Sequence, residues 1–280
     1  MKKTFSQNIA LWIAFIIFVL YAISLIFPMV TMVYNSFKLT QEFFQKPWAL
    51  PSVCTWENYA EIFEVKFQRT NIFGMFFNSM VYVFGGVTTG LVLSCMTSYI
   101  MAKYKFKGSN VFYSFIVACM LVPTVGSTPA LYRFLYQTNL LNTYAMIFIL
   151  QGGFGSTFLF MYGYFRAVSW SYAESAFIDG AGHVRTFFQI ILPHVMGGLI
   201  AMAIICYIST WNDYFTQYLY FRAKPTVAVG LQLMVSKFQI RSEWPKIFAA
   251  SIIATIPPLL VFAVFNRQIL KDTVAGGLKG

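Results

Sequence analysis

Side chains that could perform covalent or metal chemistry are few and widely spaced in this sequence. The only histidines are His183 and His194, and no two cysteines have CxxC spacing, so neither a zinc site nor a disulfide framework is predicted. No GxxxxGKS or GxxxxGKT loop is present to bind a nucleotide phosphate. Asp213 stands near the end of an apolar stretch without a basic neighbour in the pattern, so no acid–base pair is predicted there. The sequence therefore favours a protein that is not an enzyme and binds no cofactor itself.

Two of the few acidic residues, Glu174 and Asp179, lie together in the segment 166–194. Residues 172–182 predict a short helix that ends in glycine. Ser171 is placed as its cap, with Glu174 three residues later as in a capping box. We expect a second helix over 183–191.

Small side chains recur every three or four residues along the first of these helices, at Ala173, Ala176, Gly180 and the adjacent Ala181. A face of small side chains lets another surface approach closely, and the flanking carboxylates can pair with its cations. We therefore interpret the segment as a rigid helix–turn–helix that docks onto a partner and is stopped by Pro193. The alternative is an amphipathic helix that lies in the lipid headgroup region.

The composition places the rest of the chain in a membrane. Of 280 residues, 58% are hydrophobic and only 10% are charged, whereas a soluble domain carries about 25% charged residues. A soluble globular protein and a disordered one are both excluded. The net charge of +11 comes from basic residues scattered through short loops, which is typical of membrane topology and headgroup contact rather than of nucleic-acid binding.

Six uncharged stretches reach or approach the ~20 residues that a helix needs to cross a bilayer. We therefore predict an all-α membrane protein with one domain over 1–280 and six transmembrane helices. Their predicted ranges are 9–35, 73–102, 110–132, 143–165, 195–213 and 247–265. The segment 166–194 is then the loop between the fourth and fifth helices, and 266–280 is a tail.

An even number of crossings places both termini on one side of the membrane. The loops on the two sides carry equal numbers of Lys and Arg, so the count alone leaves the orientation open. The density of basic residues and the cluster Lys103, Lys105 and Lys107 favour cytoplasmic termini. On the opposite side, 38–70 is a long loop in which residues 56–67 predict a short amphipathic helix.

The segment between the fourth and fifth predicted helices resembles a motif of a known family. The pattern Glu174-Ser-Ala-x3-Gly180-x9-Ile190-x-Leu192-Pro193 is similar to the EAA loop of the permease subunits of ABC importers. Only Ser175 departs from it, at a position that is usually alanine. The run 179–181 and the ending 276–280 resemble the carbohydrate branch, typified by the second permease of maltose-type importers.

The resemblance implies a permease of the cytoplasmic membrane, one half of a heterodimer, that imports a sugar. Two copies of a separate cytoplasmic ATPase would bind ATP and Mg and dock onto the EAA loop, which would therefore be cytoplasmic. The residues implied in coupling are Glu174, Ser175, Ala176, Asp179, Gly180, Ala181 and Pro193. The tail would reach the same ATPase through Gly277, Lys279 and Gly280.

Two further surfaces follow from the resemblance. An external solute-binding protein would contact the loop 222–246 around Gly230 and Leu231. Inside the membrane, polar and aromatic side chains would line the path of the sugar. The candidates are Asn78, Gln151, Tyr207, Trp211 and Asn212.

Other functions remain open from sequence. An importer of the same family could carry a peptide, an amino acid or another small polar solute, although the ending 276–280 favours sugar. An intramembrane enzyme and a membrane scaffold belong to different classes, and the sparse catalytic groups disfavour the enzyme. The sequence does not name the sugar.

Overall fold

A computed structural model describes residues 5–67, 69–122 and 126–277, and these residues form helices joined by short connections, without a β-strand. The elements are α1 (Phe5–Asn35), α2 (Thr40–Gln45), α3 (Glu57–Glu64), α4 (Ile72–Lys103), α5 (Ser109–Leu121), α6 (Ser127–Gln137), α7 (Tyr144–Ile149), α8 (Ser156–Ala167), α9 (Ser171–Ile178), α10 (His183–Arg185), the π-helix η1 (Thr186–Ile191), α11 (Leu192–His194), α12 (Met196–Asn212), α13 (Tyr214–Tyr220), α14 (Val227–Ile240) and α15 (Trp244–Gly277). The all-α class predicted from composition is confirmed.

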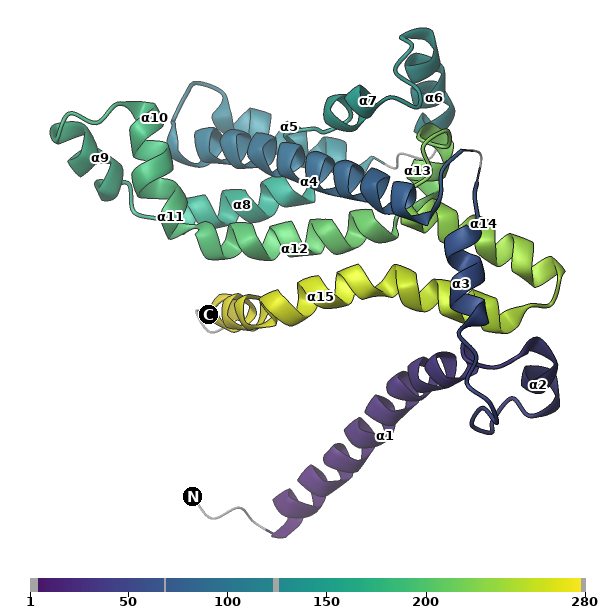
Figure 1. Ribbon diagram of the computed structural model, residues 1–280. Coiled ribbons are helices and arrows are strands. Elements are labelled where there is room, and N and C mark those ends of the chain that lie inside the picture. Colours follow the sequence, from purple (N-terminus) through teal and green to yellow (C-terminus); the bar gives the residue numbers. More distant parts are fainter. Residues whose placement is uncertain (1–4, 68, 123–125, 278–280) are drawn as a thin grey trace. The chain divides into compact units, whose positions relative to one another are not determined.

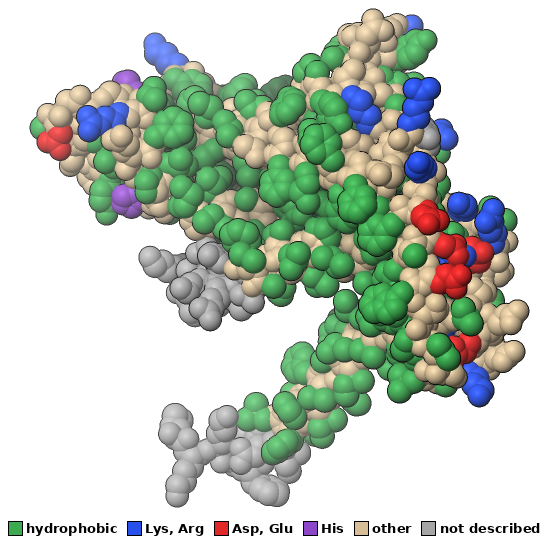
Figure 2. Space-filling model, viewed as in Figure 1, with side chains coloured by type: hydrophobic (Ala, Val, Ile, Leu, Met, Phe, Trp, Pro, Cys, Tyr) green, Lys and Arg blue, Asp and Glu red, His purple; other side chains and the backbone are tan. Residues whose placement is uncertain are grey.

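Among the described residues, three helices are long and apolar enough to cross a membrane: α1, α4 and α15. The path from His183 to Asn212 adds a fourth if its two parts, bent by 77°, are taken as one span. Hydrophobic side chains cover large parts of the visible surface, as a lipid environment requires (Figure 2). The structure thus supports a membrane protein with several crossings.

Two of the predicted spans are not single helices. The stretch 110–132 is divided between α5 and α6, and α6 begins after Gly126, whose φ of +93° lies in the left-handed region. The stretch 143–165 is divided between α7 and α8 by the non-helical residues 150–155. Hydropathy measures only how apolar a window is, so it does not detect these breaks in the backbone.

The chain forms two compact units, one of residues 1–66 and 231–256 and the other of 67–230 and 257–280. In the second unit, α4 runs alongside α8 and α12, and α9 packs on η1 (Figure 1). The non-helical residues after α7 lie close to α4, where the Thr97 hydroxyl donates a hydrogen bond of 2.6 Å to the Gly153 carbonyl. A Cβ at Gly153 would lie 2.8 Å from Thr97 Cγ2, so only glycine fits.

In the first unit, the loop after α1 is held by buried polar groups. Lys38 is fully buried and donates from Nζ to the carbonyl of Lys46 at 2.9 Å, while Asn58 Nδ2 donates to the Ser36 carbonyl at 2.8 Å. Burial lowers the pKa of the Lys38 ammonium. The predicted amphipathic helix is confirmed as α3, whose Ile62 is fully buried.

Candidate partner-docking loop

The helix α9 forms without the predicted capping box. Its N-cap residue is Trp170, which makes no side-chain cap, so Ser171 is the first helical residue rather than the cap. The Ser171 hydroxyl is instead 2.8 Å from the Ser169 hydroxyl. Glu174 therefore takes no part in a capping box, and its side chain is exposed.

Glycine ends α9, as its position in the sequence predicts. Gly180 has a φ of +81°, in the left-handed region that L side chains rarely adopt. Its N–H donates to the Phe177 carbonyl at 3.0 Å, and the next N–H, of Ala181, donates to the Ala176 carbonyl at 2.9 Å. These two bonds are typical of a Schellman motif, which satisfies the last carbonyls of the helix and fixes the direction of the turn.

The second arm of the loop is longer than predicted. The segments α10, η1 and α11 follow one another without a gap from His183 to His194, and Pro193 lies near the start of α11 rather than ending the path. Proline is tolerated in the first turn of a helix, where its missing N–H is not needed. The chain bends at Val195, by 77°, before it enters α12.

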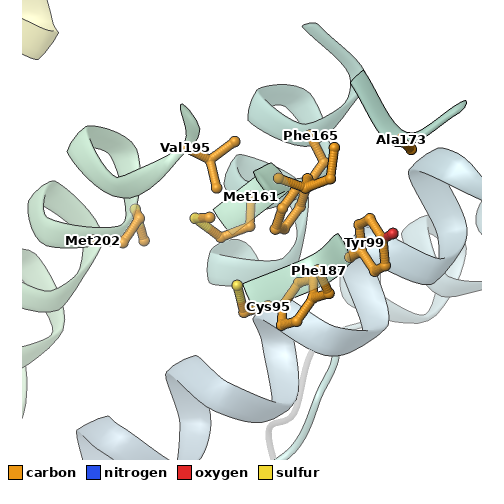
Figure 3. Packing of buried hydrophobic residues seen from close by; sticks show 9 residues of the cluster. Cys95, Tyr99, Met161, Phe165, Ala173, Phe187, Val195 and Met202 are labelled. Carbon is orange, nitrogen blue, oxygen red and sulfur yellow. The ribbon is translucent and has the colours of Figure 1, made fainter. Parts of the chain in front are cut away.

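The small side chains of α9 face the protein's own interior. Ala173 is fully buried in a cluster that includes Tyr99, Phe165 and Phe187, from three other helical segments (Figure 3). Ala176 is 7% exposed. These two alanines therefore pack inside the chain and do not form an open face. They are small because α9 packs closely against the chain itself.

An aromatic clamp, formed by Tyr104, Trp170, Phe177 and His183, holds the loop on the end of α4. The Tyr104 ring lies edge-on to Trp170 at 5.6 Å between centroids, and its hydroxyl is 2.8 Å from His183 Nδ1. Phe177 contacts both Trp170 and His183, with centroid distances of 6.0 and 4.9 Å. Lys103 Nζ also donates to the Val168 carbonyl. The loop is thus fixed to α4 at both of its arms.

The exposed face of α9 carries both polar and apolar side chains. Glu174, Ser175, Asp179 and Gly180 are exposed, and Ile178 is 86% exposed. Neither Glu174 nor Asp179 forms an ion pair within the described parts of the chain. Ile178 lies one helical turn after Glu174, so the two side chains share one face of the helix.

The loop also exposes large apolar side chains. Ile178 and Val184, which is 72% exposed, were not predicted from the sequence. In the sequence, the i, i+4 spacing from Glu174 to Ile178 could have indicated that Ile178 lies on the same helix face as Glu174. Of the predicted coupling residues, Glu174, Ser175, Asp179 and Gly180 lie on this free face, Ala176 is buried, Ala181 is half-buried and Pro193 is exposed on the other arm.

The predicted substrate-path residues have different surroundings. Asn78 is buried and structural, because Nδ2 donates to the Pro225 carbonyl and Oδ1 accepts from the Tyr144 hydroxyl. Tyr207 and Trp211 are buried and stack on each other, with 5.9 Å between ring centroids. Exposed Asn212 donates to the carbonyl one turn before it. Gln151 lines a pocket with a mainly polar surface.

Gly230 and Leu231 do not form an exposed pair. Gly230 is buried within α14, where a Cβ would collide with the Met75 sulfur, and Leu231 is half-buried. Close helix packing therefore explains the glycine. In the tail, α15 extends to Gly277, while Lys279 and Gly280 lie outside the described residues.

Comparison with known proteins gives a consistent result. The family model described as "Binding-protein-dependent transport system inner membrane component" matches residues 86–273. The diacetylchitobiose uptake system permease protein of Streptomyces coelicolor is 30% identical over 262 residues, covering 92% of this chain and 85% of the relative. The trehalose/maltose transport system permease protein of Thermococcus litoralis is 27% identical over 270 residues, covering 94% of each chain.

A solved structure shows the same fold. The crystal structure of a bacterial ABC transporter involved in the import of the acidic polysaccharide alginate contains a chain that superposes with a TM-score of 0.79. The match covers 95% of this chain and 99% of that chain, at 20% sequence identity.

Proposed function

Because the chain belongs to the family of binding-protein-dependent transport system inner membrane components, we propose that it is one permease subunit of a heteromeric ABC importer for a sugar or oligosaccharide. The functions named for its relatives, diacetylchitobiose uptake and trehalose/maltose transport, support the sugar cargo. A non-sugar solute in the same family is the second candidate, and the transport assay below separates the two.

We propose six crossings of the cytoplasmic membrane with both termini in the cytoplasm. The crossings are α1, α4, the pair α5 and α6, the pair α7 and α8, α12, and α15 as far as about residue 265. Non-helical backbone within a membrane is tolerated where it is buried in protein or lines a cavity. The contact of residues 150–155 with α4 supports such a broken crossing.

The observation that carries the function is the free face of α9 on a loop clamped to α4. In this proposal each of two cytoplasmic ATPase copies binds ATP and Mg, and one of them docks on Glu174, Ser175, Ile178 and Asp179. Its closure moves the permease through the clamp. The loop that contains α9 must be rigid, because a flexible loop would absorb the motion of the ATPase instead of transmitting it. The tail 266–280 is a second contact with the ATPase.

The remaining partners are a second permease subunit and an external solute-binding protein. The proposed contact for the binding protein is the loop 222–246, which holds α14 and its exposed residues Gln232, Lys237 and Gln239. In this arrangement the buried Gly230 shapes the loop and does not itself touch the partner.

The decisive experiment uses the whole importer in proteoliposomes. Ile178→Asp should abolish solute-stimulated ATP hydrolysis and release the ATPase during purification, because a carboxylate replaces the exposed apolar contact. Leu50→Asp is the matched control, since Leu50 is 74% exposed in the loop 38–70, which the proposed topology places on the opposite side of the membrane. Normal ATP hydrolysis and uptake by the Ile178→Asp complex would overturn the coupling assignment.

The same vesicles test the cargo. Uptake of labelled diacetylchitobiose, maltose or trehalose supports a sugar importer. Uptake of an amino acid or peptide with none of these sugars would replace it by the second candidate.

A further inference from the structure

A pocket with a mainly polar surface lies in the middle of the second unit, between α4, the start of α8 and α12. Its volume is about 260 Å³. The polar groups that line it are the side chains of Ser94, Gln151, Ser156, Thr157 and Thr210. They come from three segments that lie far apart in the sequence, so the fold assembles the pocket.

The lining has donors and acceptors but no charged side chain. Hydroxyl and amide groups bind neutral polar ligands, whereas an ion or a phosphate would call for charged partners. Phe154 adds an aromatic side chain at the same wall. A few polar groups beside an aromatic ring is the arrangement that orients a small neutral ligand.

Ser94 is the most informative of these residues. The residue is only 3% exposed, and among the residues described its hydroxyl forms no hydrogen bond, but this oxygen is not one of the fully buried unpaired atoms. A hydroxyl that no protein group pairs with, in the wall of a pocket, is free to bind a water or a ligand. Its place in the wall of the pocket supplies the room for one.

The backbone at the pocket points to the same use. Residues 150–155 are not helical, and α8 begins at Ser156 within the pocket wall. The first N–H groups of a helix have no partner inside that helix, so they add donors. Gly86 and Gly90 of α4 let Gln151 approach, because a Cβ at Gly90 would lie 3.0 Å from Gln151 Oε1.

We propose that this pocket binds one ring of a neutral polyhydroxylated solute, so that this chain itself supplies a sugar subsite. The proposal rests on the proposed function and adds where the solute is held. Pockets for drug-sized ligands measure roughly 300–1,000 Å³, so 260 Å³ suits one sugar unit rather than a whole oligosaccharide. The hydroxyls of Ser94 and Thr210 and the amide of Gln151 bind the ring, and Phe154 covers one of its faces.

A native thiol reports on the pocket directly. Cys206 lines it and is half-buried, with Sγ 3.5 Å from Thr157 Oγ1. In the whole importer, with Cys54, Cys95 and Cys119 replaced by serine or alanine, we would measure the alkylation rate of Cys206 by N-ethylmaleimide. Diacetylchitobiose, maltose and trehalose are the probes, and sn-glycerol-3-phosphate is the charged comparison.

The transported sugar should slow alkylation of Cys206 several-fold. Gln151→Leu and Thr210→Val should each weaken this protection about threefold to tenfold, as the loss of one neutral hydrogen bond predicts. Thr89→Val is the matched control, since Thr89 lies on α4 outside the pocket and its hydroxyl donates to the Gly85 carbonyl. Protection that merely follows a conformational change would persist in the two pocket variants, which would overturn the subsite.

The failures of the two proposals are distinguishable. Transport of a probe sugar without protection of Cys206 overturns the subsite and leaves the importer assignment intact. Transport of sn-glycerol-3-phosphate alone overturns the neutral sugar as cargo and with it the ligand class proposed for the pocket.

Discussion

At the scale of single residues, neighbours on α9 have opposite roles. Ala173 and Ala176 are buried in the chain, whereas Glu174 and Ser175 between them are exposed. A helix places residues three and four apart on one face, so the buried alanines and the exposed Glu174 and Ile178 define two faces of one short helix. Substitutions on the buried face should therefore lower the stability of the protein, whereas those on the exposed face should weaken the proposed contact with the ATPase.

Ala173→Leu should destabilise the protein by about 1–3 kcal/mol, because extra methylenes must enter a filled core. The rings of Phe165 and Phe187 belong to the same cluster and would have to move. Thermal unfolding of the detergent-purified chain measures the effect. Ser175→Leu is the control at an exposed site and should leave the unfolding temperature unchanged. Equal unfolding temperatures for both variants would contradict the packing described for α9.

At the scale of elements, the aromatic clamp determines how firmly the loop is held. Tyr104 contacts the first arm through Trp170 and the second arm through His183. Because one side chain joins both arms to α4, the rigidity of the loop depends on it more than on the propensity of the short helices. Isolated helices of this length are marginal in water.

Tyr104→Ala should make the segment 166–194 more sensitive to protease, because both aromatic contacts and the hydrogen bond to His183 are lost. Tyr104→Phe keeps the ring and loses only the hydroxyl, at a cost of about 0.5–1.5 kcal/mol. The rate of limited proteolysis in this segment should rank wild type, Tyr104→Phe and Tyr104→Ala in increasing order. An unchanged rate in the alanine variant would show that the clamp does not hold the loop.

The turn after α9 should depend on backbone conformation rather than on space. Nothing lies within 4 Å of the position that a Cβ would take at Gly180, but the φ of this residue is +81°. Gly180→Ala should therefore destabilise the turn by about 1 kcal/mol and lower solute-stimulated ATP hydrolysis. Gly182→Ala is a matched control, because Gly182 has equally open space and a φ of −78°. Equal losses in both variants would refute the conformational explanation.

At the scale of the whole molecule, the proposed topology assigns each loop to a side of the membrane. Cys54 is exposed in the loop 38–70, which we place outside, whereas Cys95 is buried in α4. In intact cells a membrane-impermeant maleimide should label Cys54 and leave Cys95 unlabelled. A cysteine introduced at Ser175 should react only after the membrane is permeabilised. Labelling of that cysteine in intact cells would reverse the orientation.

The sequence by itself determined the class of protein and the place of the loop that we propose for coupling. With 10% charged residues the chain has too few charges to solvate a soluble surface. The spacing from Glu174 to Gly180 and Pro193 located the loop and its glycine turn. The turn could be predicted because a backbone position that requires a positive φ is usually occupied by glycine. The helices α1, α4, α12 and α15 also followed from long apolar runs.

Only the tertiary structure decided which face of the loop is free and where polar groups gather. The small residues of α9 fit either a partner or the chain's own core, since periodicity gives a face but not its neighbour. Tyr104 and His183 are 79 residues apart, and the pocket around Gln151 depends on a break that hydropathy does not register. Contacts of this kind arise when distant segments pack together, so no local pattern reveals them.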